Sequence, residues 1–164
     1  MAYLLDANVL IQAKKLHYGL DFCPAFWEWL IEENAAGRAF SIEKVGDEIE
    51  AGGDELSDWA RDRGGGFFLK PDTAMVGALA RVSTWATSQG YEPAAVSTFL
   101  QVADYYLVAH ALVHGHSVVT HEVPSTTRKR IKIPDACISL RVKCVTLFEM
   151  LRTSKARFVL PTTT

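Results

Sequence analysis

Four acidic residues lie at or near the ends of apolar segments, where an α/β protein places its ligand-binding side chains. Asp6 and Glu122 each follow a short apolar run, while Glu48 and Asp104 lie on segments with helical spacing. Mg²⁺ and Mn²⁺ are hard cations that prefer carboxylate oxygen and water. Four carboxylates brought close together would repel one another by several kcal/mol unless cations neutralised them. The set therefore predicts a metal site.

Each of these acids also has a structural explanation. Asp104 could complement the dipole at the start of a helix, and Glu48 could be a solvated acid beside Asp47 and Glu50. A purely structural role is hardest to accept for Asp6. Its neighbours on both sides are apolar, and a charge near a core is costly unless it has a partner.

Short apolar runs alternate with segments of helical periodicity, which indicates a parallel sheet covered by helices on both faces. Because the carboxyl ends of parallel strands share one edge, acids that follow different strands can meet there. Residues 93–101 are expected to form a loop or a turn of helix, and residues 123–132 an exposed basic loop. Strands are expected at 2–5, 39–42, 67–69, 117–120 and 143–145, and helices at 7–15, 23–36, 43–51, 54–62, 72–88, 103–114, from 134 onward and at 147–151.

The composition fits one domain, expected over residues 1–152 and followed by a tail, 153–164. A chain of 164 residues that is 49% hydrophobic can bury a core without covalent staples. The three cysteines, Cys23, Cys137 and Cys144, include no C-x-x-C pair, so neither a disulfide framework nor a thiolate zinc site is indicated. No signal core is seen, and no apolar run approaches the roughly 20 residues that cross a bilayer. A cytoplasmic location without membrane contact is expected.

The net charge of -2 conceals an uneven distribution along the chain. Residues 125–164 hold nine Lys or Arg against two acids, and residues 1–124 hold eight against 17. The C-terminal part could therefore meet a polyanion, while the N-terminal part could hold cations or a basic partner. Solvated charge scattered over the surface is the simpler alternative.

Four segments resemble, in order and spacing, the acidic motifs of PIN-domain ribonucleases: Tyr3–Ile11, Val45–Ile49, Val102–Asp104 and Val118–Glu122. The segment Ile133–Cys137 reads Ile-Pro-Asp-Ala-Cys and resembles a bacterial branch of the family found beside antitoxin genes. The resemblance spans residues 2 to about 150. It implies a three-layer α/β/α fold with a central parallel sheet of four to five short strands.

The resemblance also implies an activity. Members of the family bind one or two Mg²⁺ or Mn²⁺ ions through their acids and hydrolyse RNA phosphodiester bonds, often as the toxin of a toxin-antitoxin pair. Carried over to this chain, Asp6, Glu48 and Asp104 are the expected core ligands, and Glu122 takes the fourth acidic place. RNA is the expected substrate and an antitoxin protein the expected partner.

The fourth acidic place departs from the family pattern. PIN toxins usually carry Thr-x-Asp after this strand, whereas this chain has Thr120-His121-Glu122, whose longer acidic side chain could alter the second metal site. Asp135 is a competing fourth acid, although its place after Pro134 could serve only the start of the next helix. We favour Glu122.

The chemistry implied is in-line attack of a metal-activated water on a phosphodiester. Asn8, Thr120 and His121 are expected to orient water, ligand or substrate. A basic run could follow the RNA backbone and make binding sensitive to salt, or could instead dock an acidic antitoxin. This run consists of Arg128, Lys129, Arg130 and Lys132.

Other readings remain open. His110, His114, His116 and His121 have acceptable zinc-ligand spacing, but the glutamate of H-E-x-x-H is missing. Most Trp and Tyr residues have helical spacing that indicates core packing or a homodimer interface, and we expect a homodimer. A PIN-fold interaction module without turnover is the main functional alternative. A receiver or phosphatase is disfavoured, because Asp6-Ala7-Asn8 lacks the D-x-D pair of such phosphatases.

Overall fold

The computed structural model describes residues 1–162 and has a central sheet of five parallel strands. The strands lie in the order β3-β2-β1-β4-β5, so β1 is central and has two neighbours on each side. The predicted α/β class and the predicted number of strands are confirmed. The strands are β1 (Tyr3–Leu5), β2 (Ala39–Ile42), β3 (Phe68–Leu69), β4 (Ser117–Val119) and β5 (Cys144–Val145).

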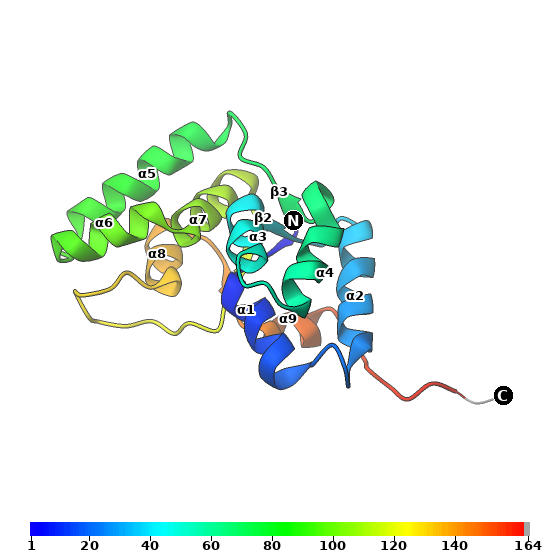
Figure 1. Ribbon diagram of the computed structural model, residues 1–164. Helices are drawn as coiled ribbons and strands as arrows, with labels where there is room; N and C mark the ends of the chain where they lie inside the picture. Colours follow the sequence, from blue (N-terminus) through cyan, green and yellow to red (C-terminus); the bar gives the residue numbers. More distant parts are fainter. Residues whose placement is uncertain (163–164) are drawn as a thin grey trace.

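Helices cover both faces of the sheet and complete a three-layer α/β/α architecture. In Figure 1, α2 and α4 lie to the right of the strands, whereas α5, α6, α7 and α8 lie to the left. The α-helices are α1 (Ala7–Gln12), α2 (Pro24–Ala35), α3 (Glu43–Glu50), α4 (Glu55–Arg63), α5 (Met75–Ser88), α6 (Pro93–Gln101), α7 (Ala103–His114), α8 (Ile133–Leu140) and α9 (Leu147–Thr153). Two short helical segments are a π-helix at Ala13–His17 and a 3-10 helix at Gly64–Gly66.

The order of the strands creates one crevice at the carboxyl edge of the sheet. The chain runs outward from β1 through β2 to β3, and then returns to the other side of β1 to form β4 and β5. Connections leave β1 and β4 in opposite directions, so the edge between these two strands stays open. This is the position at which open α/β sheets bind ligands.

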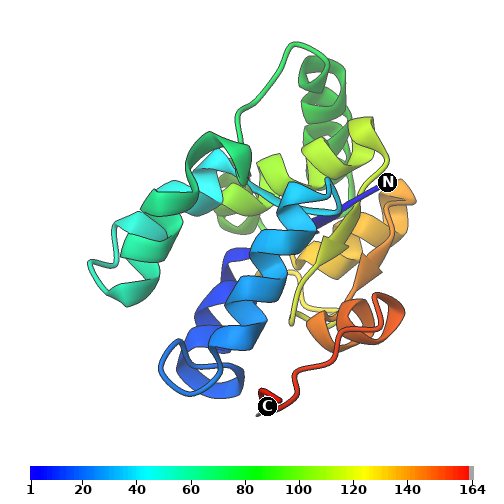
Figure 2. The ribbon, with the colours of Figure 1, turned by 90° about the vertical axis from the view of Figure 1, so that its right-hand side faces the viewer.

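The core lies on both sides of β1. Leu4 and Leu5 are fully buried, as expected for a central parallel strand that is covered on both faces. The helix α2 crosses in front of the strands in Figure 2 and buries Phe26, Trp27 and Leu30. Burial at these spacings confirms the amphipathic helix that the sequence predicts there.

Two segments differ from the sequence-based expectation. Residues 93–101 were expected to be a loop or a single turn, but they form the regular helix α6, with Pro93 at its first turn and Ala95 and Phe99 buried four residues apart. The predicted helix over residues 7–15 changes at Ala13 into a π-helix that ends at His17. Hydrophobic spacing does not reveal such a change of winding.

The connection between β4 and α8, residues 120–132, contains no helix or strand but is anchored at two points. The Glu92 N–H donates to the Arg128 carbonyl at 2.9 Å, and the Arg128 guanidinium donates to the Gln89 carbonyl at 2.8 Å. Ile131 is 3% exposed. The prediction of an exposed loop is wrong for Ile131, because its apolar side chain packs in the core and holds the basic run against the domain.

The segment after α9 lies against the domain. Phe158 makes aromatic contacts with Tyr18, Phe26 and Trp29, at ring-centroid distances of 5.6 to 6.1 Å. Within residues 1–162, no single helix is long and apolar enough to cross a membrane, although α6 and α7 together, bent by 70°, pass on length and composition.

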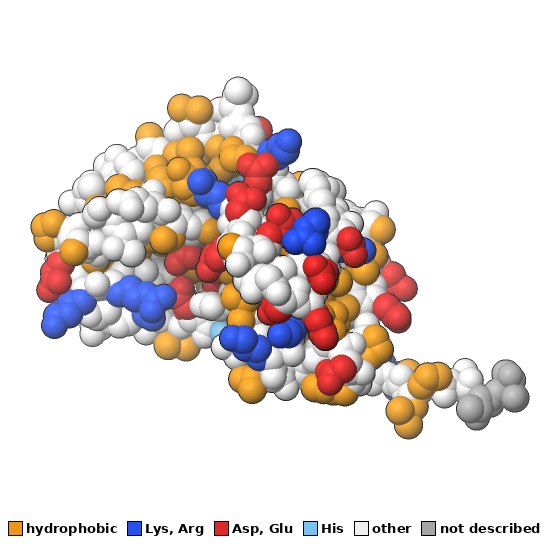
Figure 3. Space-filling view, in the orientation of Figure 1, with side chains coloured by type: hydrophobic (Ala, Val, Ile, Leu, Met, Phe, Trp, Pro, Cys, Tyr) orange, Lys and Arg blue, Asp and Glu red, His pale blue; other side chains and the backbone are white. Residues whose placement is uncertain are grey.

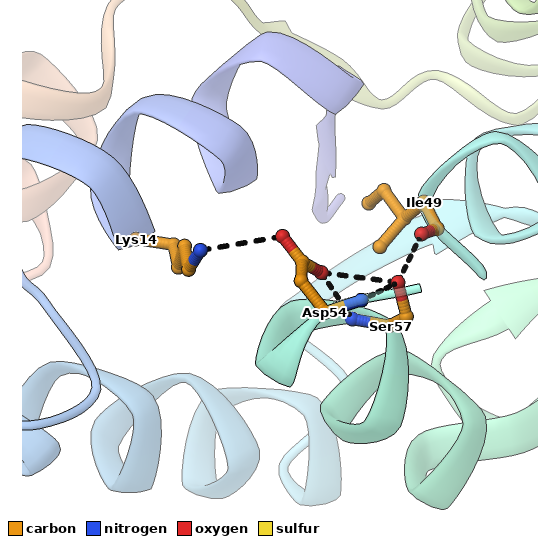
Figure 4. A network of polar contacts seen from close by, with 4 residues as sticks. All are labelled: Lys14, Ile49, Asp54 and Ser57. Carbon is orange, nitrogen blue, oxygen red and sulfur yellow. Dashed lines mark hydrogen bonds and ion pairs between the residues drawn. The ribbon is translucent and has the colours of Figure 1, made fainter. Parts of the chain in front are cut away.

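A polar network fixes the helix that carries Glu48 (Figure 4). The buried Ser57 hydroxyl donates to the Ile49 carbonyl at 2.7 Å, at the end of α3. Asp54 accepts the Ser57 N–H at 3.0 Å and forms an ion pair with Lys14 at 3.3 Å. The network therefore joins α3 to α4 and, through Lys14, to the segment that follows Asp6.

Replacing Ser57 by alanine is expected to lower the free energy of unfolding by about 1–3 kcal/mol, because it removes a buried hydroxyl that donates to the Ile49 carbonyl and accepts the Asp54 N–H. Chemical denaturation followed by circular dichroism would measure the change. Asp58→Ala, on the same helix, removes only an exposed ion pair with Arg61 and should cost no more than about 0.5 kcal/mol. Equal effects of the two substitutions would contradict this role for Ser57.

Candidate metal centre

Asp6 is buried at the mouth of the crevice between β1 and β4. Its N–H donates to the Val119 carbonyl at 2.9 Å, which continues the pairing of β1 with β4 by one residue. The Thr120 hydroxyl donates to the Asp6 carboxylate at 2.9 Å. Asp6 is only 3% exposed. The ends of two neighbouring strands therefore fix both its backbone and one of its carboxylate oxygens.

A cleft of about 750 Å³ opens beside Asp6, and we call it the acidic cleft. Glu48 reaches it from α3 and Asp104 from the first turn of α7. The remaining lining residues are Ala7, Asn8, Lys44, Asp47, Ala94, Ala95, Thr98, Phe99, Gln101, Val102, Ala103, Lys129, Arg130 and Ile131. In Figure 3, red acidic groups gather in a hollow, and blue basic groups lie on its lower left side. The structure thus brings three of the four predicted acids to one cleft.

Glu122 lies next to this cleft and is held from the backbone. Its N–H donates to the Thr120 hydroxyl oxygen at 3.1 Å, so Thr120 bridges Asp6 and Glu122. The Glu122 side chain is 8% exposed, and within residues 1–162 its buried Oε2 accepts no hydrogen bond. The Lys132 ammonium lies 4.0 Å from this oxygen.

The acids perturb one another's protonation. Burial, followed by the charges of Asp104 and Glu122, raises the pKa of Asp6 to about 7, and the hydrogen bond from Thr120 opposes this rise. Burial, followed by the charges of Glu122 and Glu48, raises the pKa of Asp104 to about 6, and Arg130 opposes this rise. Ionising this group of acids is therefore costly unless positive charge is supplied.

The donors have the chemistry that a hard cation requires. The buried carboxylate of Asp6 and the half-buried one of Asp104 have raised pKa values, and a buried Glu122 oxygen has no hydrogen-bond donor within the described residues. A divalent cation would stabilise such groups. In the part of the chain that the structure describes, no three His, Cys, Asp or Glu side chains are arranged to enclose an ion as they stand. Binding would require these side chains to rotate toward one another.

Asp135 does not line the acidic cleft. Its carboxylate accepts the Ser125 N–H, at 3.1 Å to one oxygen. This hydrogen bond fixes the loop that precedes α8. Within this structure Asp135 serves the local backbone, and Glu122 is the acid that interacts electrostatically with Asp6 and Asp104.

The residues predicted to orient the substrate are found at different places. Asn8 lines the acidic cleft, and Thr120 holds Asp6. His121 lines a second cavity, and its ring centroid lies 5.8 Å from that of His17. Burial, together with His17, lowers the pKa of His121.

The basic run is divided by its contacts. Lys129 and Arg130 line the acidic cleft, and Lys132 faces Glu122. Arg128 instead holds the loop in place, since it donates to Gln89 and lies over a tyrosine ring. The structure therefore leaves two of the four basic residues available to a ligand in the cleft.

Two histidines of α7, His110 and His114, form a separate cluster with His116, which follows the helix. His114 is hydrogen-bonded to Asp72 at 2.8 Å, and His116 accepts the Ala2 N–H at 3.1 Å. Burial lowers the pKa of His110 to about 4. His121 instead contacts His17, so the four histidines of the zinc hypothesis are divided between two places.

Lys44 and Asp47 also line the cleft, and both were missed as candidate ligand-binding residues from the sequence. They precede Glu48 by four residues and one residue, and helical spacing places Lys44 on the same face of α3 as Glu48. This spacing is the signal that could have identified Lys44.

A likeness among solved structures supports this architecture. The chain is similar to a chain in the crystal structure of VapBC2 from Rickettsia felis bound to a DNA fragment from their promoter, with a TM-score of 0.55 and 12% identity. The alignment covers 89% of this chain and 98% of that chain. The three-layer fold is PIN-like, as the acidic motifs predict.

Comparison of sequences gives a family. No curated protein matches the chain. The family model described as "Domain of unknown function (DUF4411)" matches residues 3–158, which include every acid of the cleft and end at Phe158, where the last segment packs on the domain. The chain belongs to the DUF4411 family.

Proposed function

We propose that the protein is a metal-dependent endoribonuclease that hydrolyses RNA phosphodiester bonds at the acidic cleft. The observation that carries this proposal is the convergence of Asp6, Glu48 and Asp104 from three different elements, with raised pKa values for Asp6 and Asp104. Carboxylates placed together in this way repel one another and destabilise the fold, whereas a bound cation would attract all of them.

Asp6, Glu48, Asp104 and Glu122 would hold one or two Mg²⁺ or Mn²⁺ ions. When bound, such an ion lowers the pKa of a coordinated water and polarises a phosphoryl oxygen. The cleft contains oxygen donors from carboxylates, which suit these hard cations better than soft or nitrogen-preferring metals.

The other residues of the cleft would position the RNA. Thr120 donates to one oxygen of Asp6 and so fixes the orientation of this carboxylate in the cleft. Lys44, Lys129 and Arg130 line the same cleft and would neutralise phosphates that flank the cleavage point. The apolar side chains of Ala95 and Phe99, from α6, line the same cleft.

A toxin role and an antitoxin partner form part of this proposal. The structural neighbour from Rickettsia felis is by its description VapBC2, bound to promoter DNA. Both chains share the PIN-like fold, and residues 125–164 of this chain carry a strong excess of basic side chains that would suit an acidic partner. We propose an antitoxin as the physiological partner and RNA as the substrate.

Asp6→Asn and Asp104→Asn are each expected to reduce RNA cleavage by at least about 100-fold, because each removes a charged ligand worth several kcal/mol in the transition state. Cleavage of labelled single-stranded RNA with Mn²⁺ or Mg²⁺ would measure this, and calorimetric titration with Mn²⁺ would measure metal binding. Glu48→Gln should impair both, while Glu50→Gln, an exposed neighbour outside the cleft, should not.

Cleavage that persists in chelator, or in both aspartate variants, would contradict the metal mechanism. Metal binding without cleavage of any RNA would instead favour an interaction module that retains the PIN fold. Circular dichroism of each variant would show that the fold is intact.

Stability without metal is expected to fall as the pH rises from about 4 to about 8. Asp6 has a folded-state pKa of about 7 against an ordinary value of 3.8, so the folded state binds its proton more tightly than the unfolded state. The stability this contributes is fully present below pH 3.8 and is lost as the pH rises through 7, by an amount on the order of a few kcal/mol.

Thermal unfolding in EDTA across this pH range would measure the effect. Asp6→Asn should flatten the profile, and Mn²⁺ should restore stability to the unmodified chain at pH 8. A wild-type profile that matches that of Asp6→Asn would contradict the assigned burial of charge.

Lys129→Ala and Arg130→Ala are expected to weaken RNA binding and its dependence on salt, because both side chains line the cleft. Each lost phosphate contact should reduce the slope of log K against log salt concentration by about 0.7 for a single strand. Fluorescence anisotropy of an RNA oligomer in EDTA would measure binding apart from metal. Lys143→Ala, exposed and outside the cleft, is the control, and an equal loss in it would contradict the assignment.

A further inference from the structure

A second cavity of about 440 Å³ lies beside the acidic cleft, and we call it the histidine cavity. It is lined by Asn8, Gln12, His17, His121 and Glu122. Asn8 lines both spaces, so the two are adjacent. In Figure 3 a pale blue histidine side chain shows at the lower end of the hollow that holds the acidic groups.

The histidine cavity is rich in side chains that form hydrogen bonds. Asn8 and Gln12 each bring an amide with two donors and an acceptor, and each imidazole brings two ring nitrogens. Within the described residues, the buried Nε2 of His121 has no hydrogen-bond partner. Groups of this kind match the edges of unpaired bases.

Aromatic packing fixes the two imidazoles. The ring of Phe148 meets His17 edge-on at 5.3 Å between centroids and lies 5.8 Å from His121. His17 stands at the end of the π-helix, whose wider winding adds a residue to that turn. The rings are therefore held at the cavity before any ligand binds, as a surface on which a base can stack requires.

Charge distinguishes a base from a phosphate as the occupant. Of the described residues, those that line the histidine cavity include no Lys or Arg, and Glu122 is its one acid. A phosphate would meet repulsion from Glu122, whose ion-pair partner Lys132, at 4.0 Å, does not line the cavity. The adjacent acidic cleft does contain basic side chains, from Lys44, Lys129 and Arg130. The sugar-phosphate chain therefore fits the acidic cleft, and an uncharged base fits the histidine cavity.

We propose that the histidine cavity binds one unpaired nucleobase of the RNA, next to the phosphate held in the acidic cleft, and thereby selects the sequence that is cut. This inference rests on the proposed ribonuclease function and deepens it, since it assigns specificity to Gln12 and His17. Neither residue lines the acidic cleft, so both can be changed without removing a proposed metal ligand.

The first test is the pattern of cuts in a pool of single-stranded RNA of random sequence, read by sequencing the products. The unmodified chain should show a preference for one base at one position beside the cut. Gln12→Ala and His17→Ala should each reduce this preference by about 5-fold to 150-fold, since one recognised base edge contributes about 1–3 kcal/mol. Lys15→Ala, exposed on the same π-helix, should leave the preference unchanged.

The second test separates this inference from the proposed function. Anisotropy with eight-nucleotide oligomers of U, A, C or G in EDTA should show a preferred base in the unmodified chain and loss of that preference in Gln12→Ala and His17→Ala. Calorimetric titration with Mn²⁺ should give the same binding for both variants as for the unmodified chain.

An unchanged base preference in both variants would overturn the inference while leaving the nuclease proposal standing. Loss of Mn²⁺ binding in His17→Ala would overturn it as well, because the cavity would then belong to the metal site. Failure of Mn²⁺ to bind the unmodified chain would count against the proposed function, and a base preference in EDTA that depends on Gln12 would still support the cavity.

Discussion

Burying the charge of Asp6 is the constraint on which the rest of the site depends. The residue directly follows Leu4 and Leu5, which are fully buried, and its own carboxylate is largely shielded from solvent. Thr120 supplies one hydrogen bond, which compensates only part of the lost hydration. Asp104 and Glu122 then add repulsion, and the pKa of Asp6 rises to about 7. The fold thus concentrates negative charge where water can stabilise it least.

The topology explains why the charge is located there. The connection after β1 leads to β2 on one side, and the connection after β4 leads to β5 on the other side. No connection therefore covers the crevice between the carboxyl ends of β1 and β4. The long excursion from β3 to β4 contributes α5, α6 and α7, and the first turn of α7 delivers Asp104. The acids are far apart in sequence but come from elements that end at one edge.

The sequence was sufficient to predict the sheet and three acids of the cleft, because these depend on local signals. Asp6 ends an apolar strand, and Glu48 lies on the helix that directly follows β2. Parallel pairing alone then brings them to one side. The helix α6 was not predicted, since it is short and begins at a Glu-Pro pair that is also typical of loops.

Other features could not be read from local patterns. Glu122 and Asp135 look alike in the sequence, and only tertiary contacts separate them: one repels Asp6, while the other accepts a hydrogen bond from Ser125. The partner of Arg128 lies 39 residues away, at Gln89. The pairing of His17 with His121 depends on a π-turn and a strand end 104 positions apart in the numbering, which no periodicity indicates.

The two bonds between Arg128 and the turn joining α5 to α6 have a consequence for how this family can vary. These hydrogen bonds fix the loop that carries Lys129 and Arg130 to a helical hairpin from another part of the chain. An insertion in the hairpin would move the anchor, and an insertion in the loop would slacken it. The lengths of the loop and of the hairpin should therefore change together among relatives, because the two hydrogen bonds require a fixed distance between them.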